Sequence, residues 1–116
     1  MKETELISFL KSYAIDKKFI DAQKYAMEFL NEDGVMTPSA NDERLKRMRA
    51  VESSIELLNP SEEHTLLYLH YINNIPVERC AECMYMARST AFRLLQKAHK
   101  TLCVKITKME KTYERN

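Results

Sequence analysis

Residues 80–98 read CAECMYMARSTAFRLLQKA, and this stretch decides the fold of the C-terminal half of the chain. Small and apolar residues recur through it at three- and four-residue steps, which predicts helix. We therefore expect a short helix, a tight turn and a second helix whose polar and basic side chains lie away from its apolar side.

The two predicted helices have apolar positions through which they can pack. These positions are Ile75, Cys80, Ala81, Met84, Met86, Ala91, Leu94, Leu95, Ala98 and Leu102. Small Ala81 allows the first helix to approach the second closely. On the second helix, we expect the side that carries Ala91, Leu94, Leu95 and Ala98 to be buried.

The opposite side of the second helix carries the side-chain types that contact bases and phosphates. We expect a DNA-binding surface formed by Arg79, Arg88, Ser89, Thr90, Phe92, Arg93, Gln96, Lys97 and Lys100. Arg88 and Arg93 suit guanine and Gln96 suits adenine, because these side chains make bidentate contacts to those bases. Lys97, Lys100 and, from the preceding helix, Arg79 suit phosphates. Ser89 and Thr90 suit phosphates or base edges, and Phe92 is either a partly buried core residue or a contact for a thymine methyl group.

Residues 59–102 resemble the region 4 helix-turn-helix of sigma-70-type factors and related phage regulators. The resemblance rests on VERCAE at residues 77–82 and ARSTAFRLLQKA at residues 87–98. With a helical hairpin in front of it, such a unit is similar to small phage transcriptional regulators of the RinA and ArpU type. The resemblance implies promoter DNA binding with the recognition helix in the major groove, in a protein of phage or mobile-element origin.

Two positions depart from the pattern of these proteins. The turn usually has Gly where this chain has Tyr85, so either Tyr85 adopts a left-handed backbone or the turn is wider. The usual Ser or Thr cap is replaced by Ala87, which removes a capping hydrogen bond that contributes about 1 kcal/mol.

The sequence of the N-terminal half predicts two helices that form a hairpin. Residues 3–30 have helical periodicity, with a break expected near residues 15–18. The apolar stripe of this helix is Leu6, Phe9, Leu10, Tyr13, Phe19, Ile20, Ala22, Ala26, Phe29 and Leu30. A linker from Asn31 to Asn41 contains Gly34, which suits a left-handed helix C-cap. The second helix is expected from Asp42 to Leu58, with the stripe Leu45, Met48, Val51, Ile55 and Leu58.

Capping residues and prolines predict the bounds of the helices that follow residue 58. Asn59 is expected to cap a helix with Pro60 at its first position and Glu62 in a capping box. That helix should end at Asn73–Asn74. Pro76 should open the next helix, which ends near Met84, and the last helix should run from Ala87 or Arg88 to about Met109. We thus expect an all-α chain with a hairpin region at residues 1–58, suited to oligomerisation or interaction, and a DNA-binding domain at residues 59–116.

Composition agrees with this interpretation. One Gly and three Pro disfavour an all-β fold, and no apolar run approaches the length of a membrane span. Three Cys, an odd number, predict reduced thiols and a cytoplasmic location without a signal peptide. Charge is segregated, because residues 86–116 have eight basic and two acidic side chains although the whole chain is only +1. A polyanion would therefore be attracted to the C-terminal third.

Other functions have weaker support in the sequence. Cys80 and Cys83 have the spacing of a metal or redox pair, but no second paired spacing accompanies them, so no metal or cofactor is expected. No nucleophile motif or phosphate loop supports an enzyme. Two alternatives remain: docking on RNA polymerase, for which the acidic side chains Glu62, Glu63, Glu78 and Glu82 could serve a basic partner, and a phage packaging subunit that recognises DNA. A homodimer is a further expectation for the regulator, whereas a packaging subunit would recognise DNA ends and form a ring, so a stable high-order oligomer would favour that alternative.

Overall fold

The computed structural model describes residues 1–30 and 38–114, except for the side chains of residues 27, 30, 38–41 and 111–114. Within this part, every regular element is helical. The elements are α1 (Glu3–Leu30), α2 (Pro38–Ile55), α3 (Glu62–Leu67), the π-helix η1 (Tyr68–Ile72), α4 (Val77–Cys83) and α5 (Arg88–Glu114). The all-α expectation is confirmed for these residues, and none of their helices combines the length and apolar character needed to span a bilayer.

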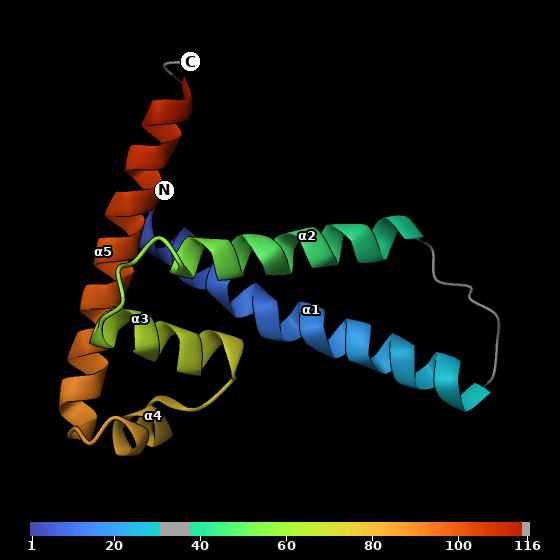
Figure 1. The fold of residues 1–116 in the computed structure, drawn as a ribbon, viewed down its shortest axis with the longest axis horizontal. Helices are drawn as coiled ribbons and strands as arrows, with labels where there is room; N and C mark the ends of the chain where they lie inside the picture. Colours follow the sequence, from blue (N-terminus) through green and yellow to red (C-terminus); the bar gives the residue numbers. More distant parts are fainter. Residues whose placement is uncertain (31–37, 115–116) are drawn as a thin grey trace.

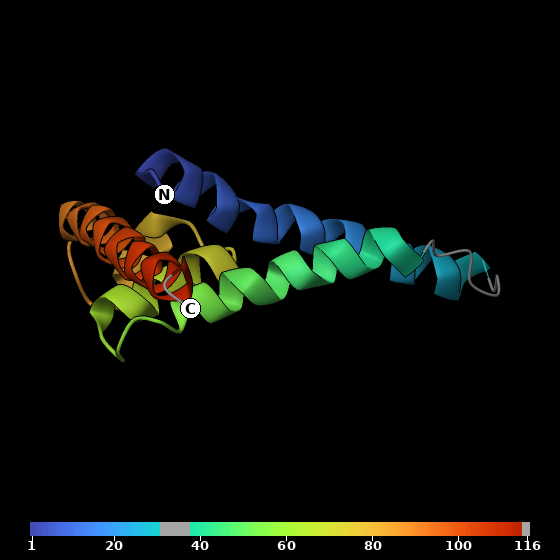
Figure 2. The same cartoon turned by 90° about the horizontal axis from the view of Figure 1, so that it is seen from above.

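The long helices α1 and α2 lie side by side and run in opposite directions, as Figure 1 shows. α5 crosses their near ends, while α3, η1 and α4 pack along the N-terminal half of α5. The view from above in Figure 2 shows that the far ends of α1 and α2 extend away from the other helices. α5 is therefore the one helix that contacts α1, α2, α3 and α4.

The main core is built where α5 crosses the other helices. Its buried residues are Leu6, Leu10, Tyr13, Val51, Ile55, Leu58, Leu67, Tyr71, Ile72, Ala98 and Leu102. They come from α1, α2, the short connection after α2, α3, η1 and α5. The described parts of residues 1–58 and 59–116 thus both contribute apolar side chains to this core.

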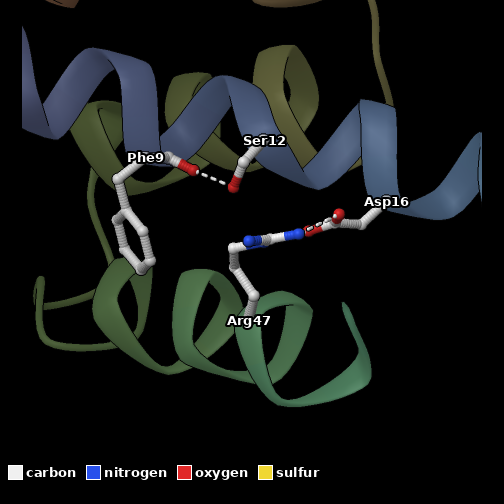
Figure 3. Close-up of polar contacts among 4 residues, drawn as sticks. All are labelled: Phe9, Ser12, Asp16 and Arg47. Atoms are coloured by element: carbon white, nitrogen blue, oxygen red, sulfur yellow. Dashed lines mark hydrogen bonds and ion pairs between the residues drawn. The ribbon is translucent and has the colours of Figure 1, made fainter. Parts of the chain in front are cut away.

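α1 is continuous through residues 15–18, so the break expected there is wrong. Asp16 occupies a position on the inward side of the helix and is only 2% exposed. It accepts two hydrogen bonds of 2.7 Å from the guanidinium group of Arg47 on α2 (Figure 3). These bonds raise the pKa of Arg47 above its ordinary value. The apolar periodicity fails at Asp16 because an ion pair takes the place of an apolar contact.

The stripe expected on the second half of α1 is wrong in part. Ile20 is buried, whereas Phe19, Ala22, Ala26 and Phe29 are exposed. Only one side of α1 can face α2, and Ile20 continues the inward positions of Tyr13 and Asp16. The side chain of Leu30 lies outside the described residues. Nearer the core, the Tyr13 hydroxyl donates a 2.8 Å hydrogen bond to Glu52, and burial together with this bond raises the pKa of Tyr13 to about 12.

α2 begins four residues earlier and ends three residues earlier than expected. It starts at Pro38, inside the predicted linker, because proline suits the first turn of a helix. It ends at Ile55, where the N–H groups of Leu57 and Leu58 bond to carbonyls three residues back and tighten the chain. Leu58 remains buried although it lies beyond the helix. The predicted C-cap at Gly34 lies outside the described residues.

Ser61, not Asn59, caps α3. Its hydroxyl accepts a 3.2 Å hydrogen bond from the N–H of His64, so the helix starts at Glu62 and Pro60 precedes it. α3 passes directly into η1, which ends before Asn73 as expected. The π-helical turn was not predicted, because a single π turn leaves no apolar periodicity of its own. Asn74 then adopts a left-handed backbone with φ 57°.

The ion pair between Asp16 and Arg47 should be required for the stability of the α1–α2 pair. We expect Arg47→Met to lower the free energy of unfolding by about 1–3 kcal/mol, because it leaves a buried carboxylate without its partner. Arg49→Met, which removes an exposed charge on the same helix, should change it by less than about 0.5 kcal/mol. Urea unfolding of the three proteins measures both values, and equal effects of the two substitutions would refute this role.

Candidate nucleic-acid interface

α4 and α5 are joined through a small second core. Val77 and Ala81 on α4 and Ala91 on α5 are buried, with Met86 and Leu95 packed against them. The two alanines have only a methyl group each, so the helices can approach closely. The expected close packing at Ala81 is confirmed. The contribution of Val77 was not predicted, although it lies four residues before Ala81 and so shares its side of the helix.

The turn between the helices has a left-handed residue at Tyr85, with φ 55°. The N–H of Met86 bonds to the carbonyl of Ala81 at 3.0 Å, and the N–H of Tyr85 bonds to Glu82 at 3.2 Å. These two bonds form a Schellman motif, which ends a helix with a left-handed residue. Of the two alternatives for this position, the left-handed backbone is the one observed. Tyr85 itself is 97% exposed.

α5 begins at Arg88, as expected, and runs to Glu114, five residues beyond the predicted end. Ala87 precedes the helix, and its carbonyl accepts a 3.0 Å hydrogen bond from the N–H of Ala91. Alanine has no side-chain acceptor for the first N–H groups of α5. Those N–H groups stay available to a ligand, and the helix dipole gives this end partial positive charge.

All nine side chains predicted to contact DNA are exposed. They are Arg79, Arg88, Ser89, Thr90, Phe92, Arg93, Gln96, Lys97 and Lys100. Eight of them lie on α5, and Arg79 lies on α4. The buried side of α5 is formed by Ala91, Ala98, His99 and Leu102, with Leu94 and Leu95 half-buried.

Four of the exposed side chains form one row along α5. We call Ser89, Arg93, Gln96 and Lys100 the central row, because their spacing of four, three and four residues places them on one face of a helix. No ion pair or side-chain hydrogen bond is observed for these four within the described structure. The row thus presents two cations, an amide and a hydroxyl that are open to a ligand.

The cations at the two edges of the row are held by carboxylates of other helices. Arg88 donates to Glu78 of α4 at 3.0 Å, and its guanidinium carbon lies 5.8 Å from the ring centroid of Phe92. Lys97 lies 3.5 Å from a carboxylate oxygen of Glu63 on α3. Arg88 and Lys97 are nonetheless about 70% exposed, so these pairs orient the side chains without burying them. Phe92 is 39% exposed and is therefore no core residue.

A buried polar contact fixes the rear of α5. The hydroxyl of Tyr71 on η1 and Nε2 of His99 are 2.7 Å apart. Burial lowers the pKa of His99 and raises the pKa of Tyr71 to about 12, so both side chains are neutral near pH 7. The two neutral groups therefore share one hydrogen bond between the Tyr71 hydroxyl and Nε2 of His99. The sequence analysis missed this pair, although His99 lies four residues after Leu95 and three before Leu102, on the inward side.

The cysteines are free thiols. Cys80 is buried, its Sγ contacts the carbonyl of Ile75 at 3.5 Å, and burial raises the pKa of its thiol. Cys83 is exposed. Among the side chains that the structure describes, His, Cys, Asp and Glu nowhere gather in a group of three or more that could hold a metal ion.

The acidic side chains proposed for a basic partner are divided by the fold. Glu63 and Glu78 are paired with Lys97 and Arg88, whereas Glu62 and Glu82 are exposed. Because two of the four carboxylates already bind cations of α5, the acidic set does not form one open surface.

Comparison with known proteins shows that more than half of the chain matches one protein family. The model of a family described as proteins of unknown function, DUF1492, matches residues 35–103. This range holds α2, α3, η1, α4 and the first sixteen residues of α5. No curated protein and no solved structure matches the chain.

Stability should depend on pH through His99. Because its pKa is lower in the folded chain than its ordinary value of 6.5, the unfolded chain binds the proton first as pH falls. The contribution of neutral His99 is complete above pH 6.5 and is lost as pH falls through the folded pKa. Urea unfolding between pH 7 and pH 5 should show a shallower loss of stability for His99→Gln than for the natural chain.

The matched control for this experiment is Tyr71→Phe. It should lower the free energy of unfolding by about 1–3 kcal/mol at each pH, because it leaves Nε2 of His99 buried without a hydrogen-bond partner. It should keep the slope with pH, because His99 stays buried. An identical slope in His99→Gln and the natural chain would exclude His99 as the titrating group.

The turn offers a second test. Tyr85→Gly should raise the free energy of unfolding by up to about 1 kcal/mol, because glycine adopts the left-handed backbone without a steric cost. Tyr85 is exposed, so the substitution removes no core contact. Met84→Gly, one residue earlier at a position with φ −97°, should destabilise the chain. Thermal unfolding of both variants distinguishes these outcomes, and a lower melting temperature for Tyr85→Gly would contradict the expected relief of strain.

Proposed function

We propose a DNA-binding function for this chain, which belongs to the DUF1492 family of proteins of unknown function. In this proposal the chain is a sequence-specific transcriptional regulator of phage or mobile-element origin. α4, the turn at Tyr85 and α5 act as a helix-turn-helix of the sigma region 4 type, and α1 with α2 forms a helical hairpin that precedes it. α5 is the recognition helix and enters the major groove.

The observation that carries the proposal is the central row on α5. Ser89, Arg93, Gln96 and Lys100 are exposed, share one face and have no observed partner within the described structure. They span the twelve residues from Ser89 to Lys100, a rise of about 16 Å along the helix. A major groove about 12 Å wide admits a helix, and Arg and Gln are the side chains that make bidentate contacts there. The row therefore carries, on a helix that the groove can admit, the side chains that make base contacts.

Packing behind α5 fixes the backbone of the central row, which supports base recognition by its side chains. Base contacts require side chains that start from a fixed backbone, because a misplaced donor loses its hydrogen bond. α5 is held from behind by Ala91 and Ala98, which are fully buried, and by the Tyr71–His99 contact. Its partly positive N-terminus lies on the side of Ser89 and Arg93, which favours an approaching phosphate.

The ion pairs of Arg88 and Lys97, at the edges of the central row, can exchange their carboxylate partners for DNA phosphates. Glu78 and Glu63 hold Arg88 and Lys97 near the central row while DNA is absent. A DNA phosphate can take the place of each carboxylate, because both cations are about 70% exposed and an ion pair at the surface contributes only about 0–1 kcal/mol. The carboxylates would also repel DNA that is bound out of register, and this repulsion improves specificity.

The test compares binding to the DNA upstream of the chain's own gene with binding to a scrambled duplex, titrated against salt. Arg93→Ala should weaken specific binding about 10- to 100-fold and reduce the preference for the native duplex, because a bidentate base contact contributes about 1–3 kcal/mol. Lys100→Ala should weaken binding to both duplexes equally and lower the salt slope by about one.

Two control variants bracket these effects. Lys46→Ala removes an exposed cation on α2, away from α5, and should leave binding unchanged. Glu63→Gln should strengthen binding to both duplexes, because it releases Lys97 and removes a negative charge near the backbone. If Arg93→Glu and Lys100→Glu bind each duplex as the natural chain does, the proposal is wrong. Absence of binding by the natural chain at low salt would also refute it and favour docking on RNA polymerase.

A further inference from the structure

The half of α1 that extends away from the core has a second apolar row, which faces solvent. We call Ile15, Phe19, Ala22, Ala26 and Phe29 the outer stripe. Their spacing of four, three, four and three residues is that of a helix seam that packs against another helix. Ile15 is 58% exposed, Phe19 52% and Phe29 75%. Tyr25, beside the stripe and 69% exposed, stacks on Phe29 with 6.1 Å between ring centroids.

Within the described structure, no other helix covers the outer stripe. The opposite side of α1 already packs on α2 through Tyr13, Asp16 and Ile20. In Figures 1 and 2 this half of α1 has α2 alone beside it, while α3, η1, α4 and α5 gather at the other end. Arg44 of α2 lies over one face of the Phe19 ring at 4.5 Å, so only part of that ring is shielded.

We propose that the outer stripe is the interface between two copies of this chain. The two α1 helices pack antiparallel about a two-fold axis that passes between residues 19 and 22. Together with the two α2 helices they form a four-helix assembly. This interface is independent of the proposed DNA-binding function, since it uses no residue of α4 or α5.

The amount of apolar surface suits such an interface. The three large side chains of the outer stripe and the neighbouring Tyr25 are each more than half exposed. Each of the four offers about 100 Å² or more of accessible surface. Burial of this surface with the two alanines covers on the order of 500 Å² per copy, or about 1,000 Å² in total, which reaches the lower end of specific interfaces. A monomer with a patch of this size would be at the upper end of what soluble proteins expose.

The order of large and small side chains makes the stripe complementary to itself. In an antiparallel pair, Phe19 of one copy lies opposite Ala22 of the other, and Ile15 lies opposite Ala26. Ile15 and Phe19 therefore each meet a methyl group, so the helices can approach closely near the axis, while Phe29 lies opposite Ser12 of the other copy in the same register. A two-fold interface requires this reciprocity, because residue i must contact residue j in both directions.

The net charge around the outer stripe favours a second copy of the chain over a nucleic acid or a membrane as its binding partner. Between residues 15 and 29 there are three lysines and three acidic residues, so this half of α1 is neutral. Two neutral surfaces associate without repulsion, whereas a nucleic acid or an acidic membrane would require a basic one. The basic surface of the chain is on α5 instead. The dimer would thus place its two α5 helices at opposite ends, away from the two-fold axis.

The first test measures molar mass by light scattering and sedimentation over about 1 to 300 µM of the full chain. The natural chain should change from monomer to dimer within this range. Ile15→Glu with Phe29→Glu should weaken dimerisation at least tenfold and keep the melting temperature of the monomer, because both side chains are exposed. Val104→Glu, which changes an apolar side chain of α5 that is 54% exposed, should dimerise like the natural chain.

Crosslinking tests the geometry. With Cys83→Ser and Cys103→Ser in place, Ala22→Cys should give a covalent dimer with a short bismaleimide, because it lies close to the two-fold axis. Lys24→Cys, two residues on and therefore on another side of the helix, should give little. A natural chain that stays monomeric at 300 µM overturns the proposal. So does dimerisation that survives the stripe substitutions or is lost in Val104→Glu.

Discussion

The burial of one side of α5 is the constraint on which the other features depend. Ala98 and Leu102 pack into the main core, while Ala91 and Leu95 pack against α4 in the small second core. A helix turns by about 100° per residue, so fixing these side chains inward fixes the direction of all the others. The exposed row on the opposite side is a consequence of this packing. The same helix thus joins the two halves of the chain and presents the candidate interface.

Two left-handed residues position α4 against α5. Asn74 precedes α4 with φ 57°, and Tyr85 follows it with φ 55°. Each ends a helical segment and turns the chain, so seven residues of α4 fit between η1 and α5. Asparagine tolerates this backbone well, whereas tyrosine does so at a cost of about 1–2 kcal/mol. Packing of Val77 and Ala81 on Ala91 offsets that cost.

Polar contacts set how α1 lies against α2. Asp16 with Arg47 and Tyr13 with Glu52 join the two helices beside the apolar contacts. A buried carboxylate must have its partner, so the ion pair excludes arrangements in which the helices slide by a turn. It also directs one side of α1 toward α2 and leaves the opposite side to solvent. The exposed aromatic side chains of α1 follow from this arrangement.

The sequence by itself determined that the described chain is helical, and it determined which side of α5 is polar. Three- and four-residue periodicity predicted α5 and its exposed side chains from Arg88 to Lys100, because a single helix has its two faces in its own residue spacing. Pro76 likewise located the start of α4 to within one residue. Tertiary structure decided which apolar side of α1 is buried, because Ile20 and Phe19 are equally apolar and only the position of α2 distinguishes them. It also decided the partners of Asp16, His99, Arg88 and Lys97, since these join residues ten or more positions apart, and residue spacing along one helix contains no information on what packs against it.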